Sequence, residues 1–343
     1  MSEIEFGHVP MVKVVRGDAV ESVHYGAAAV VDSRGEVLAS AGSPEASAFL
    51  RSAAKPFQAI PILASGAADR YGITPREIAV IVASHNGEKM HLDRVRSILR
   101  KIRCKESDLR CGAHPPFFLP AASALGRSGK RPRALHNNCS GKHAGMLALA
   151  RHLGERVKGY LSPAHPVQKA ILDVVARFTG AREGAILRGI DGCSAPTFAL
   201  SLRQAALGYA RLVDPRHGLP GEQEAAQRVV AAMRAHPEMV GGTGRLCTLL
   251  MRRVQSSFIA KIGAEGLYGM AYRDGGRCIG IALKISDGNG DRARTTAAVE
   301  ILVELGLLDG KEGDRVLLAQ GLPLVRNVRG KVVGRVAPLF RLA

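Results

Sequence analysis

The stretch ASAFLRSAAKPFQAIPILASG, residues 46–66, changes from a strand-like to a helical pattern near Ser52. This switch predicts that a strand ends and a helix begins here. Ser52 and Lys55 are three residues apart, and residues at that spacing share one face of a helix. The sequence therefore predicts a serine hydroxyl beside a lysine amine where the strand passes into the helix.

Such a pair suits nucleophilic catalysis, with Ser52 as the nucleophile and Lys55 as its base. An uncharged amine can accept the serine proton, and burial or a second cation lowers a lysine pKa enough for that. The neighbours Ala53, Ala54 and Phe57 are apolar and compatible with a dry site. The S-x-x-K spacing alone is weakly specific, since about one chance match is expected in a chain of this length. A capping serine followed by a solvated lysine is the alternative.

Two later segments complete a pattern of three. Serine enzymes of the penicillin-recognising type carry S-x-x-K, S-D-N and K-T-G in this order. Here the first motif is followed by SHN at residues 84–86 and KIG at residues 261–263, each differing at its middle position. The order predicts Ser84 and Lys261 as a second serine–lysine pair near the first.

The remaining patterns predict the fold class. Strand patterns gather towards the two ends of the chain: 11–16, 22–32, a hairpin at 266–286 with its turn at 274–276, and 331–336. Helical patterns lie at 88–102, 142–154, 165–178, 196–210, 222–235, 244–254 and 291–305. A strand is expected at 184–190 and a surface connection at 112–132, whereas the apolar run 78–83 fits either a buried strand or a helix.

This order predicts a mixed α/β (α+β) fold with an antiparallel sheet flanked by helices and a helical region in the middle of the chain. Residues 1–343 are expected to form a single domain, which could consist of two lobes. The sheet lobe would come from both termini and the helical lobe from the middle.

Cysteine and lysine residues cluster in two short segments. LHNNCSGKHAG (135–145) precedes a helical run, and IDGCSAPT (190–197) follows a strand, at the kind of connection where α/β proteins place their chemistry. Two thiolates with a nitrogen donor would suit zinc. The spacing of Cys139 and Cys193 does not itself indicate a metal, so buried structural cysteines remain the alternative, as an Asx-turn does for Asp191.

The composition bounds the function. The chain has 343 residues, 46% hydrophobic, and a net charge of +18, but its basic residues are dispersed and not interleaved with aromatics as in a base-stacking surface. No apolar run is long enough for a membrane span, and the N-terminus lacks the pattern of a signal peptide. We therefore expect a cytoplasmic protein that binds neither nucleic acid nor membrane. A basic RNA-binding protein is the remote alternative.

Together, these segments resemble the rhizobial-type (class 3) L-asparaginases, whose fold is similar to serine β-lactamases and serine-dependent glutaminases. The resemblance rests on the following stretches: RSAAKPFQ (51–58), ASHNGE (83–88), LHNNCSGKHAGML (135–147), DGCSAPTF (191–198), GGTGRLC (241–247) and KIGAEGLYG (261–269). It implies a homodimer that hydrolyses L-asparagine to L-aspartate and ammonia without an organic cofactor. A glutaminase or a penicillin-recognising hydrolase of the same fold is the alternative.

The resemblance also implies roles for individual residues. Ser52, Lys55, Ser84 and Lys261 match the catalytic residues of the family. Zinc is implied as a cofactor, without activity necessarily depending on it, and its protein ligands would be Cys139, Lys142 and Cys193. Candidates for contacts with the substrate are Arg51, Asp191 and His143. Ile262 departs from the threonine common at that position in related enzymes.

Overall fold

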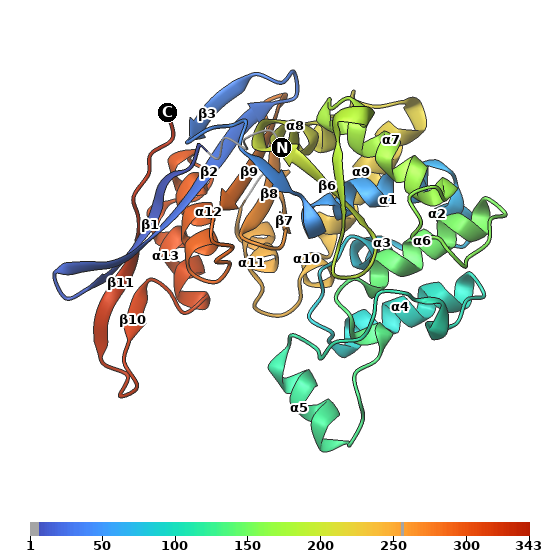
Figure 1. Ribbon diagram of the computed structural model, residues 1–343, viewed down its shortest axis with the longest axis horizontal. Helices are drawn as coiled ribbons and strands as arrows, with labels where there is room; N and C mark the ends of the chain where they lie inside the picture. Colours follow the sequence, from blue (N-terminus) through green and yellow to red (C-terminus); the bar gives the residue numbers. More distant parts are fainter. Residues whose placement is uncertain (1–6, 255–256) are drawn as a thin grey trace. The chain divides into compact units, whose positions relative to one another are not determined.

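The computed structural model describes residues 7–254 and 257–343, and these form two compact units, each described here by itself (Figure 1). The sheet unit comprises Met1–Ala53, Ala199–Arg211 and Leu249–Ala343. The helical unit comprises Ala54–Phe198 and Leu212–Thr248. Residues 1–6, on which part of the signal-peptide argument rests, lie outside the described residues.

The sheet unit is built on an antiparallel sheet. Within the described residues it has eight strands, in the order β10-β11-β1-β2-β9-β8-β7, with β3 paired to β2. Their bounds are β1 Val9–Arg16, β2 Ala19–Asp32, β3 Val37–Ala41, β7 Ile259–Ile262, β8 Leu267–Asp274, β9 Arg277–Ile285, β10 Leu324–Arg326 and β11 Val332–Pro338. Strands from the two ends of the chain thus pair directly, as β1 does with β11.

Helices cover both faces of this sheet. Tyr268 and Gly269 are consecutive residues of β8, so their side-chain directions are opposite. The Tyr268 ring lies 5.9 Å from the guanidinium of Arg294 in α12 (Ala293–Glu304). At Gly269 an added Cβ would meet the ring of Tyr209 in α8 (Leu202–Val213) at 2.2 Å, so this position requires glycine. The short helix α13 (Gly310–Ala319) packs against α12.

The helical unit surrounds one central helix. Its helices are α1 Lys55–Ala64, α2 Ala67–Arg70, α3 Pro75–Ile81, α4 Lys89–Lys101, α5 Leu119–Arg127, α6 Ser140–His152, α7 Pro166–Thr179, α9 Pro220–Ala235 and α10 Pro237–Val240. Helix α1 packs against α6, α7 and α9, and nine of its ten residues are buried. A three-stranded sheet, β4 (Ser47–Phe49), β6 (Pro196–Ser201) and β5 (Leu187–Ile190), and helix α11 (Leu246–Arg253) have residues in both units.

Two glycines bring α6 unusually close to its neighbours. A Cβ at Gly141 would lie 2.0 Å from the carbonyl oxygen of Val80 in α3, and one at Gly145 would lie 2.8 Å from the side chains of Ile62 and Ile81. The two glycines are four residues apart and so occupy one face of the helix. Their lack of side chains lets the backbone of α6 rest on α3.

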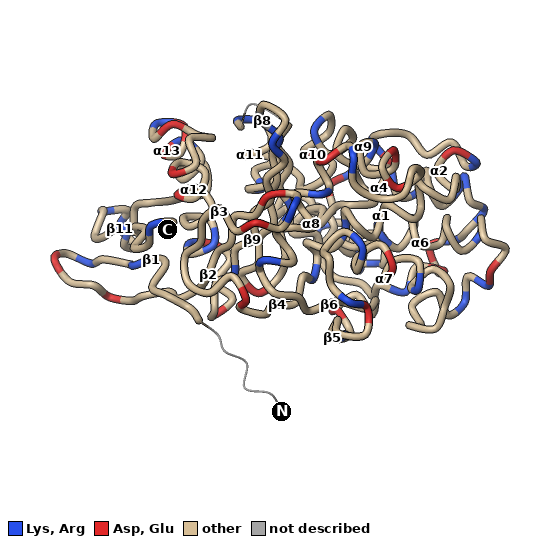
Figure 2. The backbone as a smooth tube through the Cα atoms, turned by 90° about the horizontal axis from the view of Figure 1, so that it is seen from above, with Lys and Arg blue, Asp and Glu red and all other residues tan. Residues whose placement is uncertain are grey.

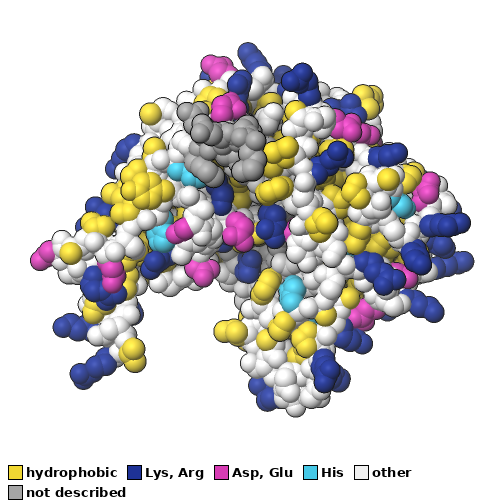
Figure 3. All heavy atoms as spheres, viewed as in Figure 1, with side chains coloured by type: hydrophobic (Ala, Val, Ile, Leu, Met, Phe, Trp, Pro, Cys, Tyr) yellow, Lys and Arg dark blue, Asp and Glu magenta, His cyan; other side chains and the backbone are white. Residues whose placement is uncertain are grey.

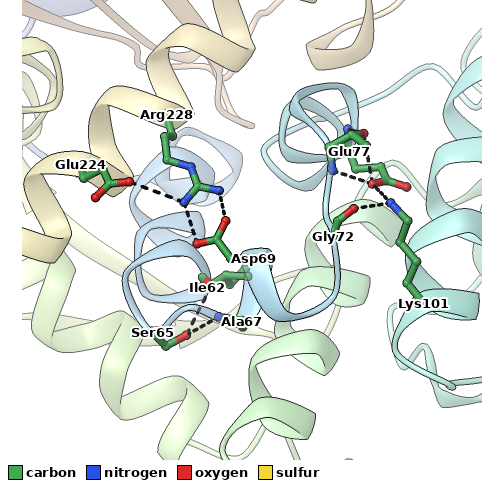
Figure 4. Close-up of polar contacts among 10 residues, drawn as sticks. Ile62, Ser65, Ala67, Asp69, Gly72, Glu77, Lys101, Glu224 and Arg228 are labelled. Carbon is green, nitrogen blue, oxygen red and sulfur yellow. Dashed lines mark hydrogen bonds and ion pairs between the residues drawn. The ribbon is translucent and has the colours of Figure 1, made fainter.

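Two ion pairs in the helical unit connect elements distant in sequence (Figure 4). Arg228 of α9 makes a bidentate ion pair with Asp69 of α2, at 2.6 and 3.0 Å. Lys101 of α4 pairs at 2.5 Å with Glu77, whose carboxylate also accepts from the backbone N–H of Thr74. Because Thr74 accepts in turn from the Glu77 N–H, the two form a capping box that begins α3.

The mixed α/β fold class is confirmed: an antiparallel sheet is flanked by helices, and the middle of the chain is largely helical. One open alternative is decided and two local expectations need correction. The run 78–83, which fitted either a strand or a helix, is helical as far as Ile81. The connection 112–132 contains α5, and residues 196–201 are a strand because β6 pairs with β4. The helix after β6 starts at Leu202, where Ser201 and Gln204 cap it reciprocally.

No helix among residues 7–254 and 257–343 is both long and apolar enough to cross a membrane. Lys and Arg are spread over the helices, strands and loops of both units (Figure 2). The positive charge is therefore dispersed along the chain, as the sequence predicts.

We expect Gly141→Ala to destabilise the protein by about 1–3 kcal/mol, because the new methyl group must push α6 away from the α3 backbone. Gly126→Ala in α5 is the matched control. Nothing lies within 4 Å of a Cβ there, so the substitution should be neutral or stabilise by up to about 1 kcal/mol. Urea unfolding of both variants measures the difference. Equal stabilities would contradict the close α6–α3 contact.

Candidate active site

Lys55, the first residue of α1, is buried, with 1% of its surface exposed. Its Nζ donates to the carbonyl oxygens of Ala83 at 2.5 Å and Asn138 at 3.4 Å, and to Ser84 Oγ at 3.1 Å. These acceptors come from the segment after α3 and the segment before α6. The predicted base and the predicted second serine are therefore in direct contact inside the helical unit.

Ser84 lies in a segment that is hydrogen-bonded to residues 240–244, which include a glycine-rich stretch. The backbone N–H of Ser84 donates to Val240 O at 3.0 Å, and that of Asn86 donates to Gly241 O at 3.1 Å. Asn86 Nδ2 also donates to the carbonyl of Thr243 at 3.1 Å. At Gly242, where φ is +115°, a Cβ would lie 2.6 Å from Asn86 Nδ2. The glycine thus permits a close contact with Asn86, and the two sequence segments form one structural element.

His85, the unusual middle residue of the S-x-N segment, is fully buried. Its Nδ1 accepts from the backbone N–H of Gly87 at 3.1 Å, which leaves Nε2–H to donate to Ser140 Oγ at 2.9 Å. The ring stacks on His91, with centroids 5.0 Å apart. Burial, reinforced by His91, holds its pKa well below the usual range. His85 is thus a neutral packing residue that joins the segment to the start of α6.

The predicted cysteine and lysine ligands meet beside Lys55. Cys139, Lys142 and Cys193 are all buried; Lys142 Nζ lies 3.0 Å from Cys193 Sγ, and the two thiols share a hydrogen bond. Lys55 also contacts the Cys139 thiol. Lys55, Ser84 and the thiol cluster therefore form one continuous polar group.

Opposite charges stabilise each other in this cluster. The hydrogen bond from Cys193, with help from the lysine cations and against the effect of burial, lowers the pKa of Cys139 well below its usual value. The same hydrogen bond and burial raise the pKa of Cys193. Burial alone would lower the pKa of Lys142, but Cys139, Cys193 and Asp191 outweigh it and raise that pKa. Without a metal, this cluster therefore favours a thiolate at Cys139 and an ammonium at Lys142. Lys142 would have to lose that proton to become a metal ligand.

His143 contributes a fixed hydrogen-bond donor. Tyr160 Oη accepts from the backbone N–H of Arg110 at 3.0 Å and lies 2.6 Å from His143 Nδ1. Burial raises the pKa of Tyr160 and holds that of His143 well below its usual value, so the tyrosine is protonated and the imidazole neutral. Tyr160 O–H then donates to Nδ1, and His143 carries its proton on Nε2. That atom is buried without a hydrogen-bond partner among the described residues.

The other predicted site residues have the following places. Asp191 is half-buried directly after β5, and its carboxylate accepts from the N–H of Gly192 at 2.7 Å. Lys261, in β7 of the sheet unit, is fully buried and donates to Ile262 O at 3.0 Å. Ser52 and Arg51 are half-buried in a 3₁₀ turn, Arg51–Ala54, that leads directly into α1.

The turn that carries Ser52 has two features that sequence patterns did not reveal. Arg51 has φ +48°, a left-handed conformation that costs energy in a residue with a side chain. The carbonyl of Ala53 accepts a 2.7 Å hydrogen bond from the hydroxyl of Tyr209. Tyr160 and Tyr209 have no sequence signal because each acts through a partner at least 17 residues away.

The donor set fits a zinc ion. In the described part of the chain, no group of three or more His, Cys, Asp or Glu side chains could hold a metal, so a metal here would need Lys142 as its third ligand. Cys193 connects the three donors: its Sγ lies 3.0 Å from Lys142 Nζ, and it shares a hydrogen bond with Cys139. Two sulfur ligands and a nitrogen ligand, with a fourth position for water, match the preference of zinc for tetrahedral S and N coordination.

The sequence profile of the L-asparaginase II family matches residues 12–338, nearly the whole chain. The chain belongs to the L-asparaginase II family. It is therefore a member of a family of amidohydrolases, and the family implies L-asparagine as the substrate. The predicted asparaginase resemblance is confirmed at this level.

Among solved structures, this L-asparaginase II family member is similar to Mglu. One crystal structure of Mglu is 17% identical, with a TM-score of 0.35, and the match covers 83% of this chain and 68% of the Mglu chain. Its native form is 16% identical, with a TM-score of 0.36, over 83% of this chain and 66% of that one. The chain thus spans about two thirds of the Mglu chains. No curated protein sequence matches significantly.

We expect the free energy of unfolding to fall as the pH is lowered from about 7 to about 5. Burial is the main cause that lowers the pKa values of His85, His91 and His143 in the folded protein. Below an unfolded pKa of about 6.5, the unfolded chain takes up protons that the native state refuses. The loss is at most about 1.4 kcal/mol per pH unit for each histidine, and these groups contribute no pH dependence above pH 7.

Urea unfolding at several pH values measures this slope. His85→Gln should reduce it, because one titrating group is removed, whereas His236→Gln, at a half-buried histidine, serves as the matched control. A stability that stays constant between pH 7 and 5 would contradict the burial of neutral histidines.

Proposed function

We propose that the protein is an L-asparaginase that hydrolyses the side-chain amide of L-asparagine through a covalent intermediate on Ser52. The family match over residues 12–338 is the observation that supports asparaginase activity. The spacing of Ser52 and Lys55 along one continuous turn, and the contact of Lys55 with Ser84, support the mechanism. Arg51 and Asp191, both half-buried, are proposed to bind the α-carboxylate and α-ammonium groups of the substrate.

In the first step, Ser52 Oγ attacks the amide carbon while an uncharged Lys55 Nζ takes the hydroxyl proton. The carbonyl π bond opens to an oxyanion, which backbone N–H groups stabilise. When the C–N bond breaks, the nitrogen leaves as ammonia after taking a proton relayed through Ser84. The 3.1 Å contact between Lys55 and Ser84 supports this relay. Lys261 is proposed to assist it.

In the second step, water attacks the β-aspartyl ester while Lys55 accepts its proton. The ester C–O bond breaks, aspartate leaves, and Ser52 regains its proton. The buried Nε2–H of His143 is a donor that the substrate or an ordered water could satisfy. Because Tyr160 fixes the tautomer, we propose that His143 acts only as a donor and does not exchange protons during turnover.

We further propose that Cys139, Lys142 and Cys193 bind zinc, with water in the fourth position. The ion would organise the groups that bind the substrate. The proposal rests on three convergent donors of suitable chemistry.

We also propose that the enzyme is a homodimer. Sedimentation velocity tests this directly, and a monomer at all concentrations would contradict it.

Ser52→Ala should lower kcat for ammonia release from L-asparagine by at least about 1,000-fold, because the nucleophile is lost. The matched control is Ser65→Ala at the other end of α1, where Ser65 Oγ donates to Ile62 O, and it should keep near-normal turnover. Thermal unfolding checks that both variants fold. Near-normal kcat in a folded Ser52→Ala variant would reject Ser52 as nucleophile. L-Glutamine assayed in parallel tests the glutaminase alternative.

Cys139→Ser and Cys193→Ser should each lower the zinc content of the purified protein several-fold, because a thiolate ligand is replaced by a hydroxyl. Cys247→Ser, at a buried cysteine of α11, should retain the zinc content of the parent protein. Elemental analysis gives the content, and absorption bands of the cobalt-substituted protein report thiolate coordination independently of activity. Equal zinc content in all three variants would contradict the proposed ligands.

A further inference from the structure

A cavity lies in the helical unit, and none of Cys139, Lys142 and Cys193 lines it. Its volume is about 710 Å³, within the range of sites for small organic molecules, about 300–1,000 Å³. It opens between α4, α5 and the segment 130–136. The apolar part of its lining is formed by Leu92, Pro116, Ala121, Ala124 and Leu125.

The rim of this cavity is strongly basic. Its cationic side chains are Lys89, Arg96, Lys130, Arg131 and Arg133. Two carboxylates reduce this charge: Asp93 pairs with Lys89 at 2.5 Å and Arg96 at 3.3 Å, and Glu106 pairs with Arg133 at 3.3 Å. Lys130 and Arg131 make no ion pair with any residue that the structure describes. The rim therefore retains a net positive charge.

The cavity also has a polar donor in its wall. His136, 7% exposed, lines it. Its Nδ1 accepts from the backbone N–H of Arg133 at 2.9 Å, and burial lowers its pKa, so the neutral ring carries its proton on Nε2. His136 is thus a hydrogen-bond donor among the residues that line the cavity.

Helix α5 leaves its cavity-facing side unfilled. Ala121, Ala124, Leu125 and Ser128 recur at helical spacing and line the cavity. No residue of α5 is buried, although most of its side chains are apolar. Figure 3 shows hydrophobic and basic side chains side by side in this part of the surface. An occupant with an apolar body would complete the packing of α5.

We propose that this cavity binds a small organic anion with an apolar body, such as an aliphatic or aromatic carboxylate, sulfonate or phosphate ester. The apolar lining takes the body, and the basic rim with His136 takes the anionic head. An inorganic anion would leave the apolar lining wet, and a neutral apolar molecule would leave the rim charges unmatched. The observations together favour an occupant that carries both features.

The cavity wall is continuous with a segment of the candidate active site. Gly87, one residue after the segment 84–86, lines the cavity, has φ +76° and packs so closely on Pro116 that a Cβ would lie 2.9 Å from it. An occupant would therefore lie directly beside the segment 84–86, which carries Ser84. The binding proposal itself does not depend on asparaginase activity, because its test measures binding alone.

The test uses the full-length protein and the fluorescent anion 8-anilinonaphthalene-1-sulfonate as probe. We expect saturable binding at low salt, competition by decanoate, and little competition by inorganic phosphate or by decanol. The three competitors distinguish a site for an anionic amphiphile from a site for a bare anion and from a site for a neutral apolar molecule. Competition by phosphate or decanol as strong as that by decanoate would overturn the proposal.

Two pairs of variants locate the probe. The double variant Lys130→Gln/Arg131→Gln should weaken binding about tenfold through lost charge, and Ala124→Phe should weaken it at least as much by filling the cavity. The controls are Arg127→Gln and Ala122→Phe, at residues of α5 that do not line the cavity. The affinity of each control for the probe should stay within about twofold of that of the parent protein. Cooperative thermal unfolding confirms that each variant is folded. Equal affinities for cavity variants and controls would overturn the proposal.

Discussion

Two lysine side chains buried in an apolar helical unit set the main constraint on this structure. Lys55 is 1% and Lys142 is 3% exposed, and a buried amine left without hydrogen-bond partners is destabilising in either protonation state. Each must therefore be supplied with acceptors by the surrounding chain. Lys55 donates hydrogen bonds to the backbone carbonyls of Ala83 and Asn138, and Lys142 donates one to the sulfur of Cys193. The segments that carry these acceptors are fixed around the two amines.

The close approach of α6 to α3 makes this arrangement geometrically possible. Gly141 lies against the carbonyl of Val80, only a few residues from both Ala83 and Asn138. The short helix-to-helix distance brings acceptors from two separate segments to the single amine of Lys55. Any side chain at position 141 would move the start of α6, and with it Cys139, relative to Lys55. A glycine in the core thus controls the geometry of a polar cluster.

Local sequence patterns predicted the elements and several members of the site, but not the contacts between them. Strand pairing at the two termini and most helices follow from periodicity, whereas residues 196–201 became a strand because β4 offered a partner, which periodicity does not report. Lys55 and Ser84 were found because their order matches a known pattern. Tyr160, which fixes the His143 tautomer, was missed because its partner is remote in sequence. The Ser52–Lys55 pairing remains a prediction from spacing.

The same degree of burial produces opposite charge states in neighbouring side chains, and the partners decide which one results. His85 and His143 have lowered pKa values because their contacts, Ser140 and Tyr160, are neutral and leave desolvation unopposed. Lys142 is equally buried, yet its pKa rises because thiol groups and a carboxylate favour its ammonium form. His143 is neutral although charged cysteine and lysine side chains lie nearby, and its contact with Tyr160 fixes its tautomer. One buried region can therefore contain neutral histidine donors and charged cysteine and lysine side chains only a few residues apart.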